Sequence, residues 1–435
     1  MTKRSNLSPR AIFFGLVIVA FVGTCSCRQM SRSSKLLPTS PSLPSTPRIA
    51  TPALPVHEAV VKTARPQNIR VALIKDAPMI RISGGKNKKL LNISGQILQQ
   101  LPDEAVLEAR FNAGTLILNG VSLSGEPAAI IESAADAPLR VNDQEASACV
   151  RVVHLPRATG LAAILQLNVE DYLPGVLAGE VPFERWHPEA LKAQAIASRS
   201  YSLYQAKKNV AEAYDVESTV MSQVFRPGYR ANPILRGAVD STRGLVLTVA
   251  SVPFPAYFHS TCGGRTSNSA IIFPDQPTFK PLCGVICSYC SASPHYRWKC
   301  ALRKDALAEK LRVYSSATAS VVKLIGLEFF DATNQSVGLT PGRLERATQA
   351  RVRHSQGLLN IGGNQFRLLV GARELKSLLL EQVADGGDII NISGGGFGHG
   401  VGMCQYGSQG MAQAGGLHTQ ILGLYYPGAE LTKLY

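Results

Sequence analysis

The strongest signal for the fold lies in residues 168–208, which read NVEDYLPGVLAGEVPFERWHPEALKAQAIASRSYSLYQAKK. This stretch predicts a short helix that ends at Gly179, a turn that contains proline, and a longer helix. Pro188 suits the first turn of the longer helix, and Glu189 complements the positive end of its dipole. An apolar face at helical spacing runs along that helix and consists of Leu191, Ala195, Ala197, Tyr201 and Tyr204.

Runs of alternating apolar and polar residues precede these helices, at IRVALI, MIRIS, TLILNGVSL and CVRVVHL. Period-two alternation broken by glycine and asparagine predicts a β-rich unit over 57–145. Strand-like runs return after Gln223, with a cysteine-rich loop, an amphipathic helix near Asp305–Leu311, and a terminal strand, glycine-rich turn and helix. We therefore expect an α+β protein whose mixed α/β domain, 146–435, carries a groove and a cysteine-rich stapled loop.

The composition limits the classes of function. The chain has 435 residues, which exceeds one compact core, and its hydrophobic content of 45% supports globular domains. The net charge is +15, but residues 1–100 alone hold 15 basic and 2 acidic residues. A nucleic-acid-binding core is disfavoured, because it would carry its cations on a folded recognition face.

The N-terminus has the features of an export signal over 1–27. Cations precede the apolar stretch 11–22, and a zone of small residues with Cys25 and Cys27 follows. The apolar stretch is too short for a hydrocarbon core of about 30 Å. Lipidation at either cysteine and ordinary cleavage nearby are both open. Residues 28–56, rich in proline, serine and threonine, are a linker that acts as a tether or a spacer. We expect an exported protein of the periplasm or cell envelope.

Glu180 is the candidate for acid–base chemistry, because it lies in a GEVP motif between the two expected helices. Apolar neighbours raise the pKa of a carboxylic acid, as a general acid near neutral pH requires. Here they are Val181, Pro182, Phe183 and Trp186. The alternative is a surface glutamate that caps the next helix. Carboxylates close enough in sequence to supply a second group are Glu170, Asp171 and Glu184.

The cysteines form a second constellation. Cys283, Cys287 and Cys290 have metal-ligand spacing. The residues that would complete a sulfur and nitrogen set for Zn²⁺ are Cys262, His259 and His295. In an oxidising compartment the same cysteines pair as disulfides. Seven cysteines beyond residue 100 is an odd number, which favours the metal. In either case the first role is to staple a long loop.

The third constellation is the glycine-rich segment 394–407, GGGFGHGVGMCQYG. It superficially fits a dinucleotide fingerprint, but the βαβ unit and later acidic residue that the fingerprint requires do not follow. Its polar residues are candidates for binding a polyhydroxylated ligand, with a structural role as the alternative for the histidine. The substrate-binding candidates are His399, Gln405 and Tyr406, together with Arg199 and Tyr201 of the longer helix.

Together these segments resemble the stage II sporulation protein D family, the SpoIID/LytB domain. The resemblance covers about 145–435 and rests on VEDYLPGVLAGEVP, PEALKAQAIASRSYSLY, FHSTCGGRT, CSASPHYRW, NQFRLLVGARELKS, GGGFGHGVGMCQYGSQGMAQAGG and LYYPG. It implies lytic transglycosylase activity on peptidoglycan glycan strands stripped of stem peptides. It places the catalytic acid/base at Glu180 and implies a zinc-bearing loop, with Cys262 and Cys290 in matching motifs. The sequence departs from the family at Val181, usually methionine, and at Cys404, usually serine.

Under this resemblance Glu180 protonates the oxygen between MurNAc and GlcNAc and then accepts the proton of the sugar's own C6 hydroxyl as a 1,6-anhydro ring closes. One glutamate suffices and no cofactor is required for the chemistry, since the nucleophile is intramolecular. Two other functions stay open: a non-catalytic, glycan-binding enhancer of a cell-wall amidase, and a Zn²⁺-dependent cell-wall amidase. A cysteine-rich metal set is closed and structural, which weighs against the last. The expected partners are glycan strands and an amidase, with no nucleic acid.

Overall fold

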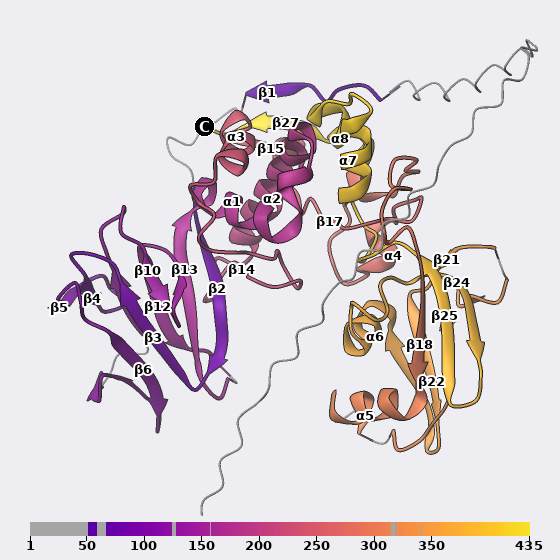
Figure 1. The fold of residues 1–435 in the computed structure, drawn as a ribbon, viewed down its shortest axis with the longest axis horizontal. Helices are drawn as coiled ribbons and strands as arrows, with labels where there is room; N and C mark the ends of the chain where they lie inside the picture. Colours follow the sequence, from indigo (N-terminus) through magenta and orange to yellow (C-terminus); the bar gives the residue numbers. More distant parts are fainter. Residues whose placement is uncertain are drawn as a thin grey trace, which may run out of the picture. The chain divides into compact units, whose positions relative to one another are not determined.

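The computed structural model describes residues 51–58, 67–123, 128–156, 158–314, 318–319, 321–340 and 342–435. All of them belong to one compact unit, Pro47–Tyr435. The predicted export signal and all but the last residues of the predicted linker lie outside the described residues. Helices and mostly antiparallel sheets confirm the α+β class (Figure 1). In the described part of the chain, no helix combines the length and apolar composition that crossing a membrane requires.

Two sheets form the first part of the fold, because alternate side chains of their strands enter a shared core. On β2, for example, Ile69 and Val71 are fully buried, as are Ile80 and Ile82 on β3. The seven-stranded sheet has the order β14 (Val216–Glu217), β2 (Asn68–Ala77), β13 (Leu161–Asn168), β12 (Cys149–His154), β9 (Ala128–Glu132), β4 (Lys89–Leu91) and β5 (Ile97–Gln100). The six-stranded sheet has the order β11 (Gln144–Glu145), β10 (Leu139–Val141), β3 (Met79–Gly84), β6 (Leu107–Asn112), β7 (Thr115–Leu118) and β8 (Val121–Ser122).

Two predicted boundaries differ from the structure. The β-rich part continues past residue 145, because β12 pairs with β9, and β13 pairs with both β12 and β2, as far as Asn168. The end of the predicted linker is also part of the fold. Strand β1 (Val56–Glu58) pairs in parallel with β27 (Glu430–Lys433), and the Leu54 N–H donates to the carbonyl of Thr419. Both differences come from pairing between distant segments.

The helices follow the prediction closely. Helix α1 spans Val169–Glu180, and α2 begins at Pro188 and spans Pro188–Lys208. The middle of α2 is buried on every side, which suits its run of alanine and serine, because it packs against α1, α3 (Pro233–Ser241), α7, α8 and β15. The 3₁₀ turn η1 (Phe183–Arg185) lies between α1 and α2.

A second hydrophobic core surrounds one face of α2, and a third lies beneath two four-stranded sheets in the second half of the chain. Helices α5 (Lys304–Tyr314) and α6 (Gly363–Val370) pack against these sheets (Figure 1). One sheet has the order β18 (Arg297–Arg303), β25 (Ile389–Gly395), β24 (Leu379–Asp385) and β21 (Glu345–Arg346). The other has the order β20 (Ser336–Val337), β19 (Leu324–Phe330), β22 (Gln349–His354) and β23 (Gly357–Gly362).

The chain returns to α2 at its end. Strand β17 (Phe258–His259) pairs in parallel with β26 (Met403–Cys404), and helix α7 (Gln405–Gln413) starts directly after it. The remaining elements are α4 (Ser269–Ile272), η2 (Lys280–Leu282), α8 (His418–Tyr425), and a sheet of β1, β27, β15 (Leu245–Val249) and β16 (Val252–Pro253). The glycine-rich segment therefore joins the third core to the helices that surround α2.

Candidate functional site

Glu180 is the last residue of α1. The next residue, Val181, is extended with a φ of −135°, and its N–H still donates to the carbonyl of Leu177. Pro182 follows, and its ring prevents the helix from continuing. The sequence placed the helix end at Gly179, so the observed end is one residue later. The Glu180 side chain thus leaves the helix where the backbone turns away.

A loop around Val224 lies directly against the end of α1. Two glycines permit this approach: a Cβ on Gly179 would collide with the Val224 carbonyl, and one on Gly175 would collide with Phe225 and with the Arg226 carbonyl. The Val224 N–H donates to Glu180 Oε1 at 2.6 Å. Because Gly175 and Gly179 have no side chains, the loop lies close enough to α1 for the Val224 N–H to donate to the Glu180 carboxyl group.

A second donor reaches Glu180 from α7. The Gln405 side-chain Nε2 donates to Glu180 Oε2 at 3.3 Å, across 225 positions of sequence. Burial raises the pKa of Glu180 to about 7, while the hydrogen bonds from Val224 and Gln405 act in the opposite direction. The neighbouring Val181 and Phe183 side chains are buried, as the predicted apolar surround requires. A carboxyl group with this pKa can both give and accept a proton near neutral pH.

Glu180 lines a cavity of about 370 Å³, which we call the Glu180 cavity. The described residues that line it are Ala178, Gly179, Glu180, Val181, Pro182, Phe183, Glu184, Arg226 and Tyr229. Of the nearby carboxylates considered from the sequence, Glu184 lines this cavity and is exposed. Glu170 and Asp171 do not line it. Glu180 is thus a partly exposed wall residue of this cavity.

Arg199 has a structural role, so its prediction as a substrate-binding residue is wrong. Its side chain is 0% exposed, and its Nε and Nη2 donate to the Glu170 carboxylate at 3.0 and 2.8 Å. The Tyr435 hydroxyl also donates to Glu170, at 2.6 Å. An enclosed guanidinium with this partner has no surface left for a substrate.

Tyr201 is buried, and it lines a separate cavity of about 940 Å³ near Gln205 and Ser222. Burial raises the pKa of Tyr201, hydrogen bonds to Gln205 and Ser222 oppose this, and the nearby Glu180 charge adds to it. Tyr201 is therefore close to the catalytic candidate but faces another cavity. Contact of Tyr201 with a substrate stays a prediction.

The glycine-rich segment leads into α7, and it positions Gln405 and Tyr406 near Glu180 and the residues that follow it. Gly402 has a φ of 69° and lies against the Tyr257 carbonyl, where a Cβ would not fit. Gln405 then begins α7 and contacts Glu180 as described. The Tyr406 ring packs edge-on against Trp186, with ring centroids 5.7 Å apart. Both residues therefore lie beside the segment that follows the catalytic candidate.

His399 is held by the backbone on both sides of its ring. Its Nε2 donates to the Phe258 carbonyl at 2.9 Å, and the Val401 N–H donates to its Nδ1 at 3.1 Å. The hydrogen bond to a ligand predicted for His399 does not fit this arrangement, because neither ring nitrogen is free. His399 instead forms part of the wall of another cavity, of about 570 Å³.

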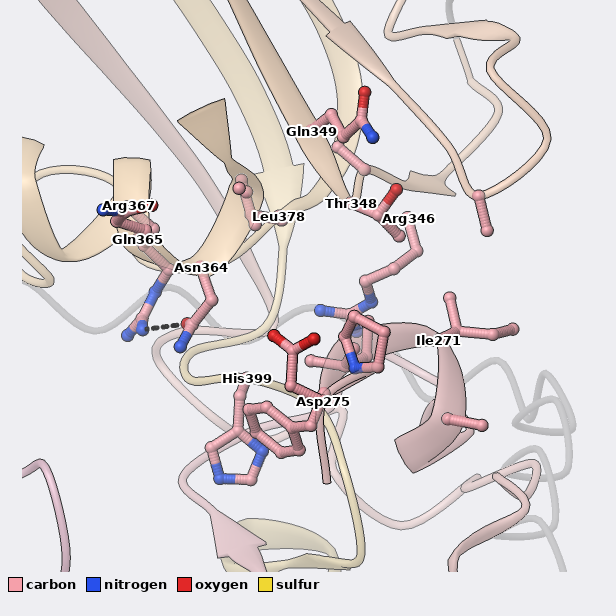
Figure 2. Close-up of a pocket in the computed structure, with 18 of the residues that line it drawn as sticks. Ile271, Asp275, Arg346, Thr348, Gln349, Asn364, Gln365, Arg367, Leu378 and His399 are labelled. Atoms are coloured by element: carbon pink, nitrogen blue, oxygen red, sulfur yellow. Dashed lines mark hydrogen bonds between the residues drawn. The ribbon is translucent and has the colours of Figure 1, made fainter. Parts of the chain in front are cut away.

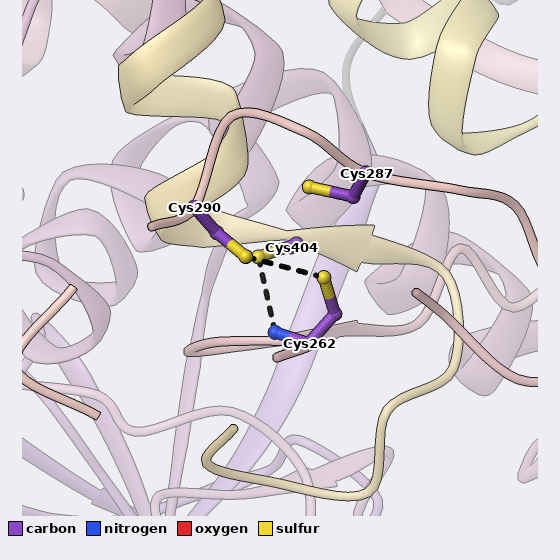
Figure 3. A group of neighbouring side chains, drawn as sticks. All are labelled: Cys262, Cys287, Cys290 and Cys404. Atoms are coloured by element: carbon purple, nitrogen blue, oxygen red, sulfur yellow. Dashed lines mark hydrogen bonds between the residues drawn. The ribbon is translucent and has the colours of Figure 1, made fainter. Parts of the chain in front are cut away.

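Four cysteines converge between β17, β26 and the cysteine-rich loop (Figure 3). The sulfur atoms of Cys262, Cys287, Cys290 and Cys404 all lie within 4.8 Å of one another, and all four residues are buried. The Sγ atoms of Cys262 and Cys290 are 3.5 Å apart. Zn–S bonds of about 2.3 Å give sulfur separations of about 3.8 Å in a tetrahedron. The cluster therefore fits one tetrahedral ion, and none of its four members forms a disulfide in the structure.

Backbone groups support this cluster. The N–H groups of Cys262 and Gly407 both donate to Cys404 Sγ at 3.2 Å. Hydrogen bonds from Cys262 and Cys290 lower the pKa of Cys287, which favours a thiolate there. Thiolate ligands with N–H donors to their sulfur atoms are typical of metal centres.

The cluster corrects part of the predicted metal set. Cys283 is exposed and its sulfur lies near the Gly284 carbonyl, away from the cluster. His259 Nδ1 donates to the Val401 carbonyl, and His259 is not among the four. Cys404 was not in the predicted set, because its sequence distance from the other cysteines hides the parallel pairing of β17 with β26 that brings it beside Cys262.

Comparison with known proteins places the chain in a family. The SpoIID model, described as stage II sporulation protein, matches residues 157–249, which contain Glu180. An uncharacterized protein of Brachyspira hyodysenteriae is 32% identical over 283 residues, which cover 64% of this chain and 71% of the relative. This chain belongs to the SpoIID family.

Two named SpoIID relatives come from Bacillus subtilis. Stage II sporulation protein D is 28% identical over 295 residues, which cover 63% of this chain and 77% of the relative. A protein named amidase enhancer is 29% identical over 297 residues, which cover 60% of this chain and 40% of that longer relative. The SpoIID-matched range holds both α1 and α2, whereas Gln405 and the cysteine cluster lie beyond it.

Proposed function

We propose that this chain is a lytic transglycosylase that cleaves the bond between MurNAc and GlcNAc in peptidoglycan glycan strands without stem peptides. Its products would be strands with 1,6-anhydro-MurNAc ends. The observation that carries this proposal is Glu180, a residue of a cavity wall whose carboxyl pKa burial raises to about 7. Such a group is partly protonated near neutral pH, so it can serve as acid and base within one cycle.

The reaction balances with this one residue. Protonated Glu180 donates to the glycosidic oxygen, the bond from MurNAc C1 to that oxygen breaks, and GlcNAc leaves with a hydroxyl group. The C6 hydroxyl of the same MurNAc attacks C1, and its proton passes to the Glu180 carboxylate. Glu180 thereby regains its proton, and no water is consumed. A second carboxylate nucleophile is not required, because the nucleophile belongs to the substrate.

The two donors assign the carboxyl oxygens. Each oxygen has one donor: the Val224 N–H donates to Oε1 at 2.6 Å, and Gln405 Nε2 donates to Oε2 at 3.3 Å. We propose that Oε2, which has the longer contact, carries the proton of the acid. After proton transfer, both donors stabilise the carboxylate.

The four-cysteine cluster would hold a structural Zn²⁺ through Cys262, Cys287, Cys290 and Cys404. A bound ion would cross-link the cysteine-rich loop to β26, directly before Gln405. Four thiolates fill a tetrahedral site and leave no position for a reactive water. This donor set supports the transglycosylase over a Zn²⁺-dependent amidase.

A second candidate function is a non-catalytic enhancer of a cell-wall amidase, which the likeness to the Bacillus subtilis amidase enhancer favours. For both candidates we propose an exported protein of the cell envelope that acts during division or wall remodelling. Its partner would be an amidase, which prepares strands by removing their stem peptides. The two candidates differ in whether the chain itself cuts the glycan.

The test is incubation of the purified full chain with glycan strands free of stem peptides, followed by mass spectrometry of the strand ends. The wild type is expected to generate anhydro-MurNAc ends, and Glu180→Gln is expected to generate none while still binding strands. Glu108→Gln is the matched control, because Glu108 is exposed on β6, and it should retain activity. Wild-type protein that binds strands but produces no new ends would favour the enhancer.

A further inference from the structure

The cavity of about 570 Å³ beside His399 has a wall that the proposed reaction does not use (Figure 2). We call it the arginine cavity. It is formed by α4 and the turn after it, the segment from β21 to β22, the start of α6, and the glycine-rich turn. The lining residues that matter for its chemistry are Asp275, Arg346, Asn364, Arg367 and His399.

Arg367 is a buried cation with neutral partners. It is 6% exposed, its Nε donates to the Lys376 carbonyl at 3.0 Å, and its Nη1 donates to Asn364 Oδ1 at 3.3 Å. Within the described residues it forms no ion pair. Buried guanidinium groups are usually paired with a carboxylate, because neutral partners offset only part of the lost hydration.

Arg346 approaches the same cavity from β21. Its Nε is buried and has no hydrogen-bond partner, and its guanidinium packs against Gly400 of the glycine-rich turn. It too forms no ion pair in the part of the chain that the structure describes. Figure 2 shows the guanidinium groups of Arg346 and Arg367 approaching the cavity from two sides. Burial is the main cause that lowers the pKa of His399, and the charges of His259, Arg367 and Arg346 add to it, so both arginines lie near this ring.

Neither arginine has a carboxylate partner among the described residues. The pKa of each is lowered to about 10, mainly by burial, and for Arg346 the charge of Arg367 acts in the same direction. Cys262 opposes the shift for Arg346, but burial is the cause that acts on Arg367. An anion in the cavity would offset this cost and accept charge-assisted hydrogen bonds from both groups.

Asp275 limits which anion fits. Its carboxylate is exposed and extends into the cavity region between His399 and Arg346 (Figure 2). It would repel a polyanion, but it can accept a hydrogen bond from a hydroxyl or amide N–H. The cavity therefore suits a ligand with a single negative charge and polar donors beside it.

We propose that the arginine cavity binds the free lactyl carboxylate of a MurNAc residue in the glycan strand. This proposal rests on the proposed function, since it assumes a glycan substrate. In a strand of MurNAc and GlcNAc, the lactyl group carries the negative charge, and it does so only after the stem peptide has been removed. While the peptide is attached, the group is a neutral amide. The MurNAc N-acetyl N–H or a hydroxyl would donate to Asp275.

The position of the cavity agrees with a strand that also reaches Glu180. His399 lines the arginine cavity, and Gln405, which contacts Glu180, follows six residues later in the chain. That segment can span at most about 20 Å when extended. The bound MurNAc would therefore lie a few sugars along the strand from the bond that is cut. Recognition of the free carboxylate there would make the chain selective for stripped strands.

The experiment compares two forms of one substrate. Stripped strands are used as they are, or after carbodiimide coupling to methylamine, which converts the lactyl carboxylates to neutral amides. Binding is measured by calorimetry on the full chain carrying Glu180→Gln, so that the strands stay intact. We expect about tenfold or greater preference for the free carboxylates, the size expected for a hydrogen bond to a charged group.

Substitutions in the arginine cavity test whether the preference for free lactyl carboxylates arises there. Arg367→Gln and, separately, Arg346→Gln should remove it while leaving the affinity for the amidated strand unchanged, and Asp275→Asn should increase it. Arg81→Gln is the control, since Arg81 lies on β3 in the six-stranded sheet. Equal affinity of the Glu180→Gln chain for both strands would overturn the proposal without any need for a folded arginine variant. Competition of isolated stem peptides with the strands would also overturn it, because the carboxylates of the peptides would then be the ligand.

Activity measurements separate this proposal from the proposed function. The chain with Glu180 intact is given both strands, and new anhydro-MurNAc ends are counted. Equal rates and equal affinities on both strands would leave the transglycosylase standing and refute carboxylate recognition. A preference in binding with no product from either strand would leave carboxylate recognition standing and refute the transglycosylase.

Discussion

Replacing Glu180 with glutamine should stabilise the folded chain at alkaline pH, although it abolishes the proposed activity. Burial raises the pKa of Glu180 from its ordinary 4.5 to about 7. The folded chain therefore binds this proton more tightly than the unfolded chain does. The contribution of this tighter proton binding to the free energy of unfolding is fully present below about pH 4.5. It is lost as the pH rises through about 7, where Glu180 of the folded chain ionises.

The size of the effect follows from the shift. Each pKa unit corresponds to about 1.4 kcal/mol, so the ionised Glu180 destabilises the fold by up to about 3 kcal/mol above neutral pH. Glutamine has no charge to bury and can still accept the Val224 hydrogen bond. The free energy of unfolding of Glu180→Gln should therefore exceed that of the wild type by up to about 3 kcal/mol at about pH 8, and match it near pH 4.

Urea unfolding of the full chain at several pH values measures this difference. The control is Glu108→Gln, an exposed position on β6, where the change should stay within about 0.5 kcal/mol at every pH. A glutamine variant that is no more stable than the wild type at about pH 8 would contradict the raised pKa. Glu180 would then be ionised near neutral pH and would lack the proton that a general acid donates.

Four further results are expected. The initial rate of anhydro-end formation should fall as the pH rises through about 7, because the reaction begins with protonated Glu180; a flat profile would contradict this. Gly179→Ala should displace the loop that donates to the Glu180 carboxyl group and shift that decline to higher pH, because a hydrogen bond that lowers the pKa is lost. Cys404→Ser should lower the zinc content measured by metal analysis, and exposed Cys283→Ser should not. Arg199→Met should lower the free energy of unfolding by about 3–5 kcal/mol in urea, because a buried carboxylate loses its partner.

Local signals made much of the fold predictable. Period-two alternation predicts β2 and β3, Pro188 marks the start of α2, and the amphipathic pattern near Asp305–Leu311 corresponds to α5. Each of these features depends on a few neighbouring residues. The β-rich part ends at Asn168 rather than residue 145. The alternating run CVRVVHL already marks β12 beyond that boundary, but the pairing of β13 with β2 joins segments far apart in the sequence, which no local pattern reveals.

In the candidate site, too, features set by neighbouring residues were predictable, and contacts between distant residues were not. Glu180 was predictable because a glycine, an apolar surround and a proline flank it in sequence. Its donors were not fully predictable: Gln405 was a candidate for ligand binding, but its contact with Glu180 joins positions far apart in the chain. Arg199 was misassigned because burial and its partner Glu170 appear only in three dimensions. Cys404 was missed for the same reason, since parallel pairing of β17 and β26 brings it to Cys262.

The central claim is that Glu180 alone drives an intramolecular ring closure. The most direct test is to run the reaction on stripped strands in water enriched in ¹⁸O and to examine the new strand ends by mass spectrometry. The account predicts anhydro-MurNAc ends without ¹⁸O from the wild type and no new ends from Glu180→Gln. New ends that carry ¹⁸O would identify hydrolysis by water, and unlabelled anhydro ends from Glu180→Gln would show that another residue is the acid; either result would contradict the account.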